Sequence, residues 1–272
     1  IADLLPTDPN AHVIFSPQEA LFLVPFPALQ ASDGHYLIEQ HTVLTAPSIQ
    51  VLDLTHQKHQ QLSGKAKSVL VVGNPTMPKV SLPLGAPPQA LPSLPGAEQE
   101  AKAIATLLNT QALTGNQATK AAVLQQMSQT RLVHLATHGL LDDFKGLGIP
   151  GAIALAPSGK DDGLLTASEI LDLKLNTDLV VLSACDTGRG RITGDGVVGL
   201  SRSLIAAGAP SVIVSLWQVP DAPTATLMTQ FYQALQQKPD KAQALRQAML
   251  ATMKQHPDPK DWAAFTLVGE AQ

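Results

Sequence analysis

The chain has 272 residues, 44% of them hydrophobic and 15% charged, and its formal net charge is -4. That length fits one large domain or two small ones, and a chain of this size buries roughly three quarters of its unfolded surface without disulfides. A single cysteine excludes a disulfide framework and a cysteine-built zinc site. The mild acidity argues against direct binding of nucleic acid.

Targeting and membrane signals are absent from the sequence. No apolar run reaches about 18 residues, and no basic segment precedes an apolar one at the start, so we expect neither a membrane-spanning helix nor a signal peptide. Because the chain starts at Ile1 and not at methionine, we expect a piece of a longer protein. A cytoplasmic location follows as the prediction.

The N-terminal part predicts short strands and one helix. Apolar runs at 11–15 and 20–26 are cut short by prolines, as is typical of strands at a sheet edge, and 36–44 predicts a further strand. Residues 52–62 predict a polar helix. A β-branched run at 68–72 is typical of a strand buried on both faces.

The segment 74–96 is the most irregular part of the chain, and we call its residues 75–95 the Pro-rich loop. Prolines at positions 75, 78, 83, 87, 88, 92 and 95 exclude a regular helix or a central strand. A loop of this length in a compact domain is either functional or mobile.

From residue 97 onward, predicted helices and strands alternate, and Thr166 with Glu169 has the spacing of a capping box. This order predicts an α/β fold with a mostly parallel central sheet and helices on both faces, whose sites lie at the carboxyl ends of the strands. The last strand is expected to close the sheet. Helices are predicted at 97–108, 119–127, 166–171, 196–207, 222–236 and 242–254, and strands at 131–136, 152–156, 179–184, 211–216 and 262–268.

Two predicted strands end in reactive residues, namely His138 in the run 133–139 and Cys185 in the run 180–188. If the strands are parallel neighbours, the imidazole and the thiol emerge at one edge of the sheet. A thiolate can attack a carbonyl carbon while histidine protonates the leaving amine. The N–H groups of Gly139 and Cys185 are then candidates for an oxyanion hole.

Other interpretations of these residues remain open. Lone cysteines are usually buried core thiols, and Cys185 fits that description too. His134 is expected to be packed and hydrogen-bonded, because no third ligand for a metal is evident. Ser183, Ser201 and Ser215 are alternative nucleophiles, but none lies in a Gly-x-Ser-x-Gly elbow.

Two further features concern ligand binding. A Gly-x-Gly-x-x-Gly motif at 194–199 is similar to a dinucleotide-binding loop, but it does not directly follow its strand, so we interpret it as a loop and helix start. Asp221 follows an apolar strand, where a carboxylate can pair with a basic side chain in a pocket. A helix N-cap is an equally good interpretation of Asp221.

Taken together, these residues resemble the CHAT domain of the caspase-like cysteine peptidases, over nearly the whole chain. The stretch Trp217-Gln218-Val219-Pro220-Asp221 is similar to the Trp-x-Val-x-Asp of the related separases, whose acid is thought to select a basic residue before the cut. The other motifs that carry the resemblance are Ala136-Thr137-His138-Gly139, Leu182-Ser183-Ala184-Cys185-Asp186-Thr187-Gly188, Gly196-Val197-Val198-Gly199-Leu200, Ala207-Gly208-Ala209-Pro210-Ser211-Val212 and Trp262-Ala263-Ala264-Phe265.

The resemblance implies a caspase-like fold forming one CHAT domain, with 1–96 as a pseudo-caspase-like portion and 97–272 as the catalytic portion. It implies a dyad of His138 and Cys185, with Gly139 in the oxyanion hole. Family members often follow tetratricopeptide repeats, so a repeat region or regulator in the longer protein is an expected partner.

We therefore expect a cysteine endopeptidase that cuts a protein or peptide after Arg or Lys, with no metal and no cofactor. Trp217, Gln218 and Asp221 are the expected substrate-binding residues. A caspase-like signalling or binding module that cleaves nothing is the alternative, because the family includes inactive copies. A nucleotide-binding domain ranks third.

Overall fold

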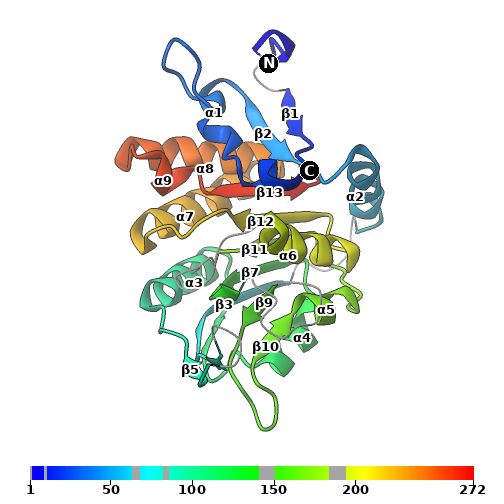
Figure 1. The fold of residues 1–272 in the computed structure, drawn as a ribbon, viewed down its shortest axis with the longest axis vertical. Helices are drawn as coiled ribbons and strands as arrows, with labels where there is room; N and C mark the ends of the chain where they lie inside the picture. The colour runs from blue at the N-terminus through cyan, green and yellow to red at the C-terminus, as the bar shows by residue number, and fades with distance from the viewer. Residues whose placement is uncertain (1, 9–10, 63–67, 82–85, 141–150, 184–193) are drawn as a thin grey trace.

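Figure 1 shows the fold in a computed structural model, which describes residues 2–8, 11–62, 68–81, 86–140, 151–183 and 194–272. Among these residues, eight strands form one central sheet. They are β1 (His12–Phe15), β2 (Thr42–Thr45), β3 (Val69–Pro75), β6 (Ala112–Gly115), β7 (Leu132–Ala136), β11 (Leu179–Leu182), β12 (Ser211–Ser215) and β13 (Phe265–Gly269).

The sheet is mostly parallel, as the alternation of helices and strands predicted. Its order is β1-β2-β13-β12-β11-β7-β3-β6. Five strands are parallel to one another, namely β12, β11, β7, β3 and β6. Strand β13 is antiparallel to β12, and β2 and β1 are parallel to β13. The carboxyl ends of β3, β7, β11 and β12 therefore share one edge of the sheet.

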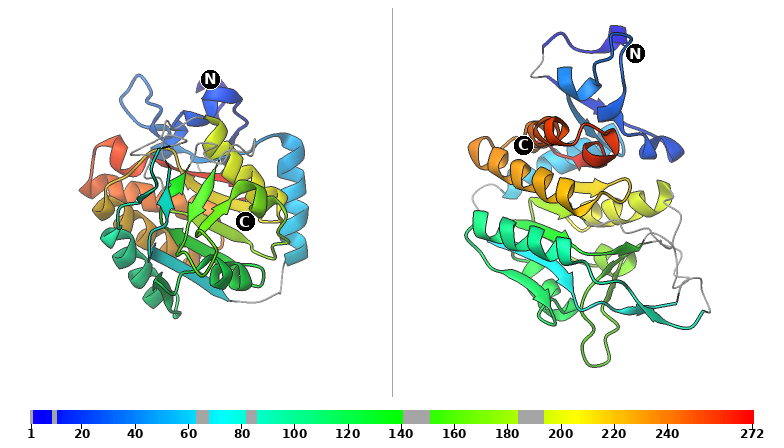
Figure 2. Two further views of the ribbon diagram at one scale, coloured as in Figure 1. Left: turned by 60° about the horizontal axis from the view of Figure 1, so that its bottom comes forward. Right: turned by 90° about the vertical axis from the view of Figure 1, so that its left-hand side faces the viewer.

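Helices cover both faces of the sheet, and the side-chain alternation along the strands decides which residues face which layer. Val71, Val181 and Ile213 face one layer, and the residues beside them in their strands face the other. Figure 2 shows the two layers from other directions. One layer contains α3 (Pro95–Leu107), α7 (Asp221–Gln237) and α8 (Lys241–Gln255), and the other contains α4 (Lys120–Met127), α5 (Ala167–Leu171) and α6 (Gly194–Ala206).

The predicted helices are confirmed, with their caps. Thr119 accepts a hydrogen bond from the Ala122 N–H (3.2 Å) at the start of α4, and Thr166 with Glu169 forms the capping box of α5. The polar helix predicted at 52–62 is α2 (Ile49–Leu62). Every helix within the described ranges is too short or too polar to cross a bilayer.

The predictions for the N-terminal part are wrong in two places. Residues 20–26 form no strand but belong to the 3-10 turns η2 (Glu19–Leu23) and η3 (Phe26–Ala28), because Pro25 and Pro27 leave too few N–H groups for a ladder. The strand expected at 36–44 is divided into α1 (Leu37–Gln40) and β2, because the Glu39 carboxylate accepts the Tyr36 N–H and starts a helical turn.

The end of the sheet also differs from the prediction. β13 does not close it, because β2 and β1 pair beyond β13 and form the edge. The edge strand β6 at the other side was not expected at all, since its four residues carry no alternating pattern. Strands β1 and β2, from the N-terminal part of the chain, thus extend the sheet beyond β13, from the C-terminal part. The division of the chain at residue 96 stays a prediction.

The Pro-rich loop contains two short strands, β4 (Lys79–Val80) and β5 (Gln89–Ala90), which pair antiparallel. A second small sheet lies next to the end of β7. It consists of β8 (Gly139–Leu140), β9 (Ala152–Ala154) and β10 (Leu164–Thr166), with β8 at its edge.

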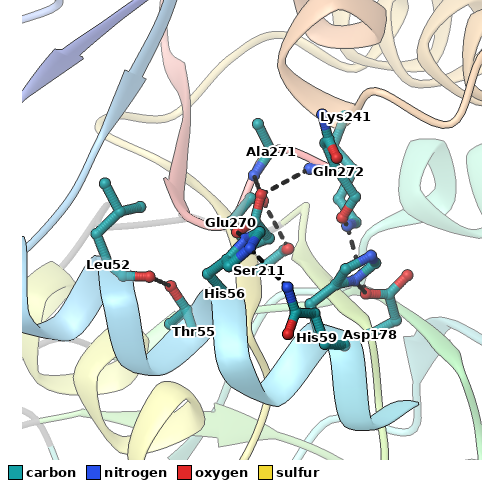
Figure 3. A network of polar contacts seen from close by, with 11 residues as sticks. Leu52, Thr55, His56, His59, Asp178, Ser211, Lys241, Glu270, Ala271 and Gln272 are labelled. Atoms are coloured by element: carbon teal, nitrogen blue, oxygen red, sulfur yellow. Dashed lines mark hydrogen bonds and ion pairs between the residues drawn. The ribbon is translucent and has the colours of Figure 1, made fainter. Parts of the chain in front are cut away.

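A buried acid joins three elements at the amino edge of the parallel strands (Figure 3). Asp178, 7% exposed, lies 2.8 Å from His59 Nδ1 of α2 and 3.3 Å from Lys241 Nζ of α8. Arg131, before β7, approaches the other carboxylate oxygen at 3.5 Å. Burial lowers the pKa of Lys241, and the charge of Asp178 partly opposes that effect.

Glu270 forms the second centre of this network. Its carboxylate accepts the N–H groups of Ala271 (2.8 Å) and Gln272 (3.0 Å) and lies 2.8 Å from His56 Nδ1. Burial opposes the ionisation of Glu270, but these hydrogen bonds outweigh it and hold the pKa below its ordinary value. The network fixes α2 and the C-terminus to the sheet.

The substitution Asp178→Ala leaves Lys241 buried without its acid, so we expect it to lower the free energy of unfolding by about 3–5 kcal/mol. Asp172→Ala, at a nearby exposed acid, should change stability by less than about 0.5 kcal/mol. Urea denaturation of both variants checks this. Equal effects would show that the network does not stabilise the fold.

Candidate active site

The strands that lead to the candidate dyad are parallel neighbours. β7 and β11 pair in register, with Leu135 opposite Leu182, and the Ser183 N–H continues the ladder to the Leu135 carbonyl at 3.0 Å. His138 follows Leu135 at the same sequence offset as Cys185 follows Leu182. Cys185 itself lies outside the described residues, as does its N–H, so its position stays a prediction.

A backbone carbonyl of the Pro-rich loop contacts His138. Its ring is 1% exposed, and Nε2 lies 2.7 Å from the carbonyl oxygen of Pro92 in the Pro-rich loop. A carbonyl oxygen only accepts hydrogen bonds, so Nε2 carries the proton. Nδ1 is therefore the nitrogen that can take a proton from a neighbouring group.

The segment with Pro92 is anchored by Asn74, which has a φ of 44° near the end of β3, where the pairing with β6 is irregular. The side-chain oxygen of Asn74 accepts the Leu94 N–H (2.8 Å) and the Ser93 hydroxyl (3.1 Å). Its amide nitrogen donates to Glu98 of α3 at 3.0 Å. These contacts position the backbone next to the carbonyl that orients His138, and the sequence analysis did not identify them.

The backbone N–H of Gly139, the candidate oxyanion-hole donor, points away from the neighbouring strand. The Ala154 N–H donates to the His138 carbonyl at 2.9 Å, so those two residues form a hydrogen-bonded antiparallel pair. Hydrogen-bonded and non-hydrogen-bonded pairs alternate, so Gly139, opposite Ile153, directs its N–H away from β9. Because β8 is an edge strand, that N–H faces outward from the small sheet.

His134 is packed and hydrogen-bonded, as predicted. It is fully buried, and Nδ1 lies 3.0 Å from the Tyr232 hydroxyl. Nε2 is 3.1 Å from a Glu100 oxygen, although outside hydrogen-bond geometry. Burial, and secondarily the charge of Glu100, raises the pKa of Tyr232 well above its ordinary value. This cluster joins β7 to α3 and α7.

The residues after β12 reach the same edge of the sheet. Trp217 is half-buried, and its indole N–H donates to the Lys260 carbonyl at 2.9 Å, while Gln218 is exposed. The Trp217 ring packs against the cores of both faces, so its contacts are partly structural. Substrate binding by these two residues stays a prediction.

The N-cap interpretation of Asp221 is wrong, because the cap of α7 is Pro220 and Asp221 is the first helical residue. The exposed Asp221 side chain lies against Gly96 in the first turn of α3. A Cβ on Gly96 would stand 2.0 Å from Oδ2 and 2.4 Å from Cβ of Asp221. Within the described ranges, the Asp221 carboxylate has no hydrogen bond and no ion pair.

The remaining candidates are placed less favourably. Ser183, Ser201 and Ser215 are all less than 9% exposed, so a peptide has little access to their hydroxyls. The glycine motif at 194–199 forms the first turns of α6, in line with its interpretation as a helix start. No cluster of three metal-ligating side chains occurs in the described part of the chain.

The substitution Gly96→Ala should destabilise the protein by about 1–3 kcal/mol, because the new methyl group overlaps the Asp221 side chain. In an Asp221→Gly background the overlap disappears, and the same substitution should be nearly neutral. Thermal unfolding of the four proteins of this cycle measures the coupling. An equal cost in both backgrounds would contradict the contact.

Comparisons with known proteins agree with this architecture. A model of the CHAT domain matches residues 2–270. Tetratricopeptide repeat protein 28 of Mus musculus is 31% identical and that of Homo sapiens 32% identical, over 97% of this chain in each case. The chain spans only 12% of the length of these relatives.

Two kinds of solved structure share the fold. The Arg-specific cysteine proteinase gingipain R superimposes with a TM-score of 0.55 at 12% identity, over 84% of this chain and 54% of its own. Separase in the Saccharomyces cerevisiae separase–securin complex gives 0.55 at 14% identity, over 91% of this chain and 15% of the other. At such identities the likeness shows a caspase-like fold and nothing about activity.

Proposed function

The chain belongs to the CHAT domain family, and we propose that it is a cysteine endopeptidase acting through Cys185 and His138. The observation that carries this proposal is the position of His138. Its ring follows β7, directly beside the strand that continues to Cys185, and its Nε2 is bound to the Pro92 carbonyl. Because Nε2 donates to this carbonyl, Nδ1 is the nitrogen that we assign to proton transfer to and from the reacting groups.

The reaction would proceed in two steps. The Cys185 sulfur attacks the scissile carbonyl carbon, the C–N bond breaks to leave a thioester, and His138 gives the thiol proton to the leaving amine. A water molecule then attacks the thioester while His138 takes its proton, and the C–S bond breaks to release the carboxylate. The Gly139 N–H, with that of Cys185, would stabilise the oxyanion in both steps.

Asp221 is our candidate for recognition of the residue before the cut. Its carboxylate is exposed at the carboxyl edge of the sheet and has no cationic partner among the described residues. Fixed contact with Gly96 keeps it next to the loop that carries Pro92. A guanidinium or ammonium group is the natural partner of such a carboxylate, so we propose cleavage after Arg or Lys. Gingipain R, described as Arg-specific, offers a parallel.

A cytoplasmic location and a regulatory partner complete the proposal. The relatives are named as tetratricopeptide repeat proteins, and the chain matches only 12% of their length. A repeat region or a regulator in the longer protein would then control access to the dyad.

One observation favours the alternative, a signalling module with a caspase-like fold and no activity. His138 is only 1% exposed and contacts the Pro92 carbonyl, so in this arrangement the ring has little access to a substrate. An arginine-directed acyloxymethyl ketone distinguishes the two functions, because it alkylates the cysteine of a competent dyad. Mass spectrometry should find the adduct on Cys185.

We expect the protein to hydrolyse fluorogenic peptides that end in Arg or Lys before the reporter. Cys185→Ala should abolish this activity, because the nucleophile is lost. Asp221→Asn should lower kcat/KM for the Arg peptide by about tenfold to hundredfold and leave the low rate on a Leu peptide unchanged.

Asp172→Asn, at an exposed acid remote from the edge, serves as the matched control and should keep full activity. Unfolding curves confirm that each variant is folded. Hydrolysis by Cys185→Ala at the wild-type rate would overturn the mechanism. An Asp221→Asn variant with unchanged preference for Arg would overturn only the specificity.

A further inference from the structure

A large concavity lined by residues of α2 and of the C-terminal half of α6 lies away from the candidate dyad. Figure 1 shows where the two helices lie in the fold. The volume of the concavity is about 1150 Å³, and its floor includes residues 171–176 after α5. That volume exceeds the 300–1,000 Å³ typical of small-molecule sites. We call it the α2–α6 groove.

The two long walls of the groove are helix faces. Val51, Leu54 and Lys58 line it from α2 at positions that share one helical face, and Arg202 and Ile205 line it from α6. Leu54 is 62% exposed, and Leu171 on the floor is 38% exposed. Two helices with an open apolar strip between them leave the space that a third helix occupies in helix-in-groove recognition.

Most of the charged side chains around this apolar strip are positive. Among the described residues that line the groove, three are basic, namely Lys58, Lys174 and Arg202, and Asp172 is the only acid, although the whole chain has a net charge of -4. Within the described ranges, none of these cations forms an ion pair. The Arg202 guanidinium lies 5.7 Å from the centre of the Phe22 ring.

The Lys58 side chain reaches towards the end of α6. An added Cβ on Gly208 would stand 3.3 Å from Lys58 Cε and 3.4 Å from Nζ, so the ammonium group lies near Gly208, which also lines the groove. Lys58 and Arg202 therefore bring positive charge to the groove from its two helical walls.

We propose that the α2–α6 groove binds an amphipathic helix of a protein partner, with apolar side chains on one face and Asp or Glu on its flanks. The apolar face would cover Leu54 and Leu171, and the acidic flanks would pair with Lys58, Lys174 and Arg202. Burial of the exposed leucines supplies affinity, and the cations set the orientation and select acidic over basic helices.

The test uses a fluorescein-labelled synthetic 18-residue helix with Leu at i, i+3, i+4 and i+7 spacing and Glu elsewhere. Fluorescence anisotropy should give saturable binding to the whole chain, and a Leu/Lys helix of the same spacing should not bind. Leu54→Glu and Arg202→Glu should each weaken binding at least tenfold, which corresponds to about 1.4 kcal/mol.

Ile49→Glu is the matched control, because Ile49 is 80% exposed on the same helix and lies outside the groove. It should bind as wild type does. Absence of saturable binding by the Leu/Glu helix, or equal losses in Ile49→Glu and Leu54→Glu, overturns the proposal. So does groove-dependent binding of phosphatidylserine vesicles in place of the peptide, which would reassign the groove to a membrane surface.

Discussion

The hydrogen bond between His138 Nε2 and the Pro92 carbonyl is the constraint on which the candidate site depends. It fixes the orientation of the imidazole and assigns the proton to Nε2, so that Nδ1 is the nitrogen proposed to exchange a proton with a substrate. The carbonyl is fixed in turn by Asn74, whose side chain binds the backbone after Pro92 and reaches Glu98 of α3. A loop that is irregular in sequence thus has a defined position next to the strand ends.

The same segment also reaches the proposed specificity residue. Gly96 follows Pro92 by four residues, in the first turn of α3, and lies against Asp221 at the start of α7. The orientation of the histidine and the position of the acid are therefore set by one continuous stretch of backbone. A movement of this stretch would alter proton transfer and substrate recognition together, which is a physical reason for regulation to act here.

The two edges of the sheet have different roles. At the amino edge, the buried charges of Asp178, Lys241 and Glu270 are compensated and stabilise the attachment of α2 and the C-terminus. At the carboxyl edge, the Asp221 carboxylate is exposed and has no ion pair within the described ranges. An exposed carboxylate is solvated by water and is available to pair with a cationic side chain of a ligand, which is the role proposed for Asp221.

Sequence patterns predicted the parallel sheet, its helices and their caps because hydrophobic periodicity and capping are local. Apolar content predicted strands at 20–26 and 36–44, and both predictions failed. Prolines prevent a strand in the first segment, and the contact between Glu39 and Tyr36 starts a helical turn in the second. The motifs identified His138 and Asp221 as candidates, but not Pro92 or Gly96. Pro92 contributes a backbone carbonyl, and Gly96 contributes the absence of a side chain next to Asp221. Neither contribution involves a reactive side chain that a sequence motif would reveal.

The rate at which iodoacetamide alkylates Cys185, measured against pH, tests the central claim most directly. As the chain's only cysteine, Cys185 gives an unambiguous signal. If the imidazole lies beside the thiol, the wild-type rate should rise at lower pH than in His138→Gln, whose profile should follow a free thiol with a pKa near 8.5. Superimposable profiles in the folded wild type and variant would contradict the dyad.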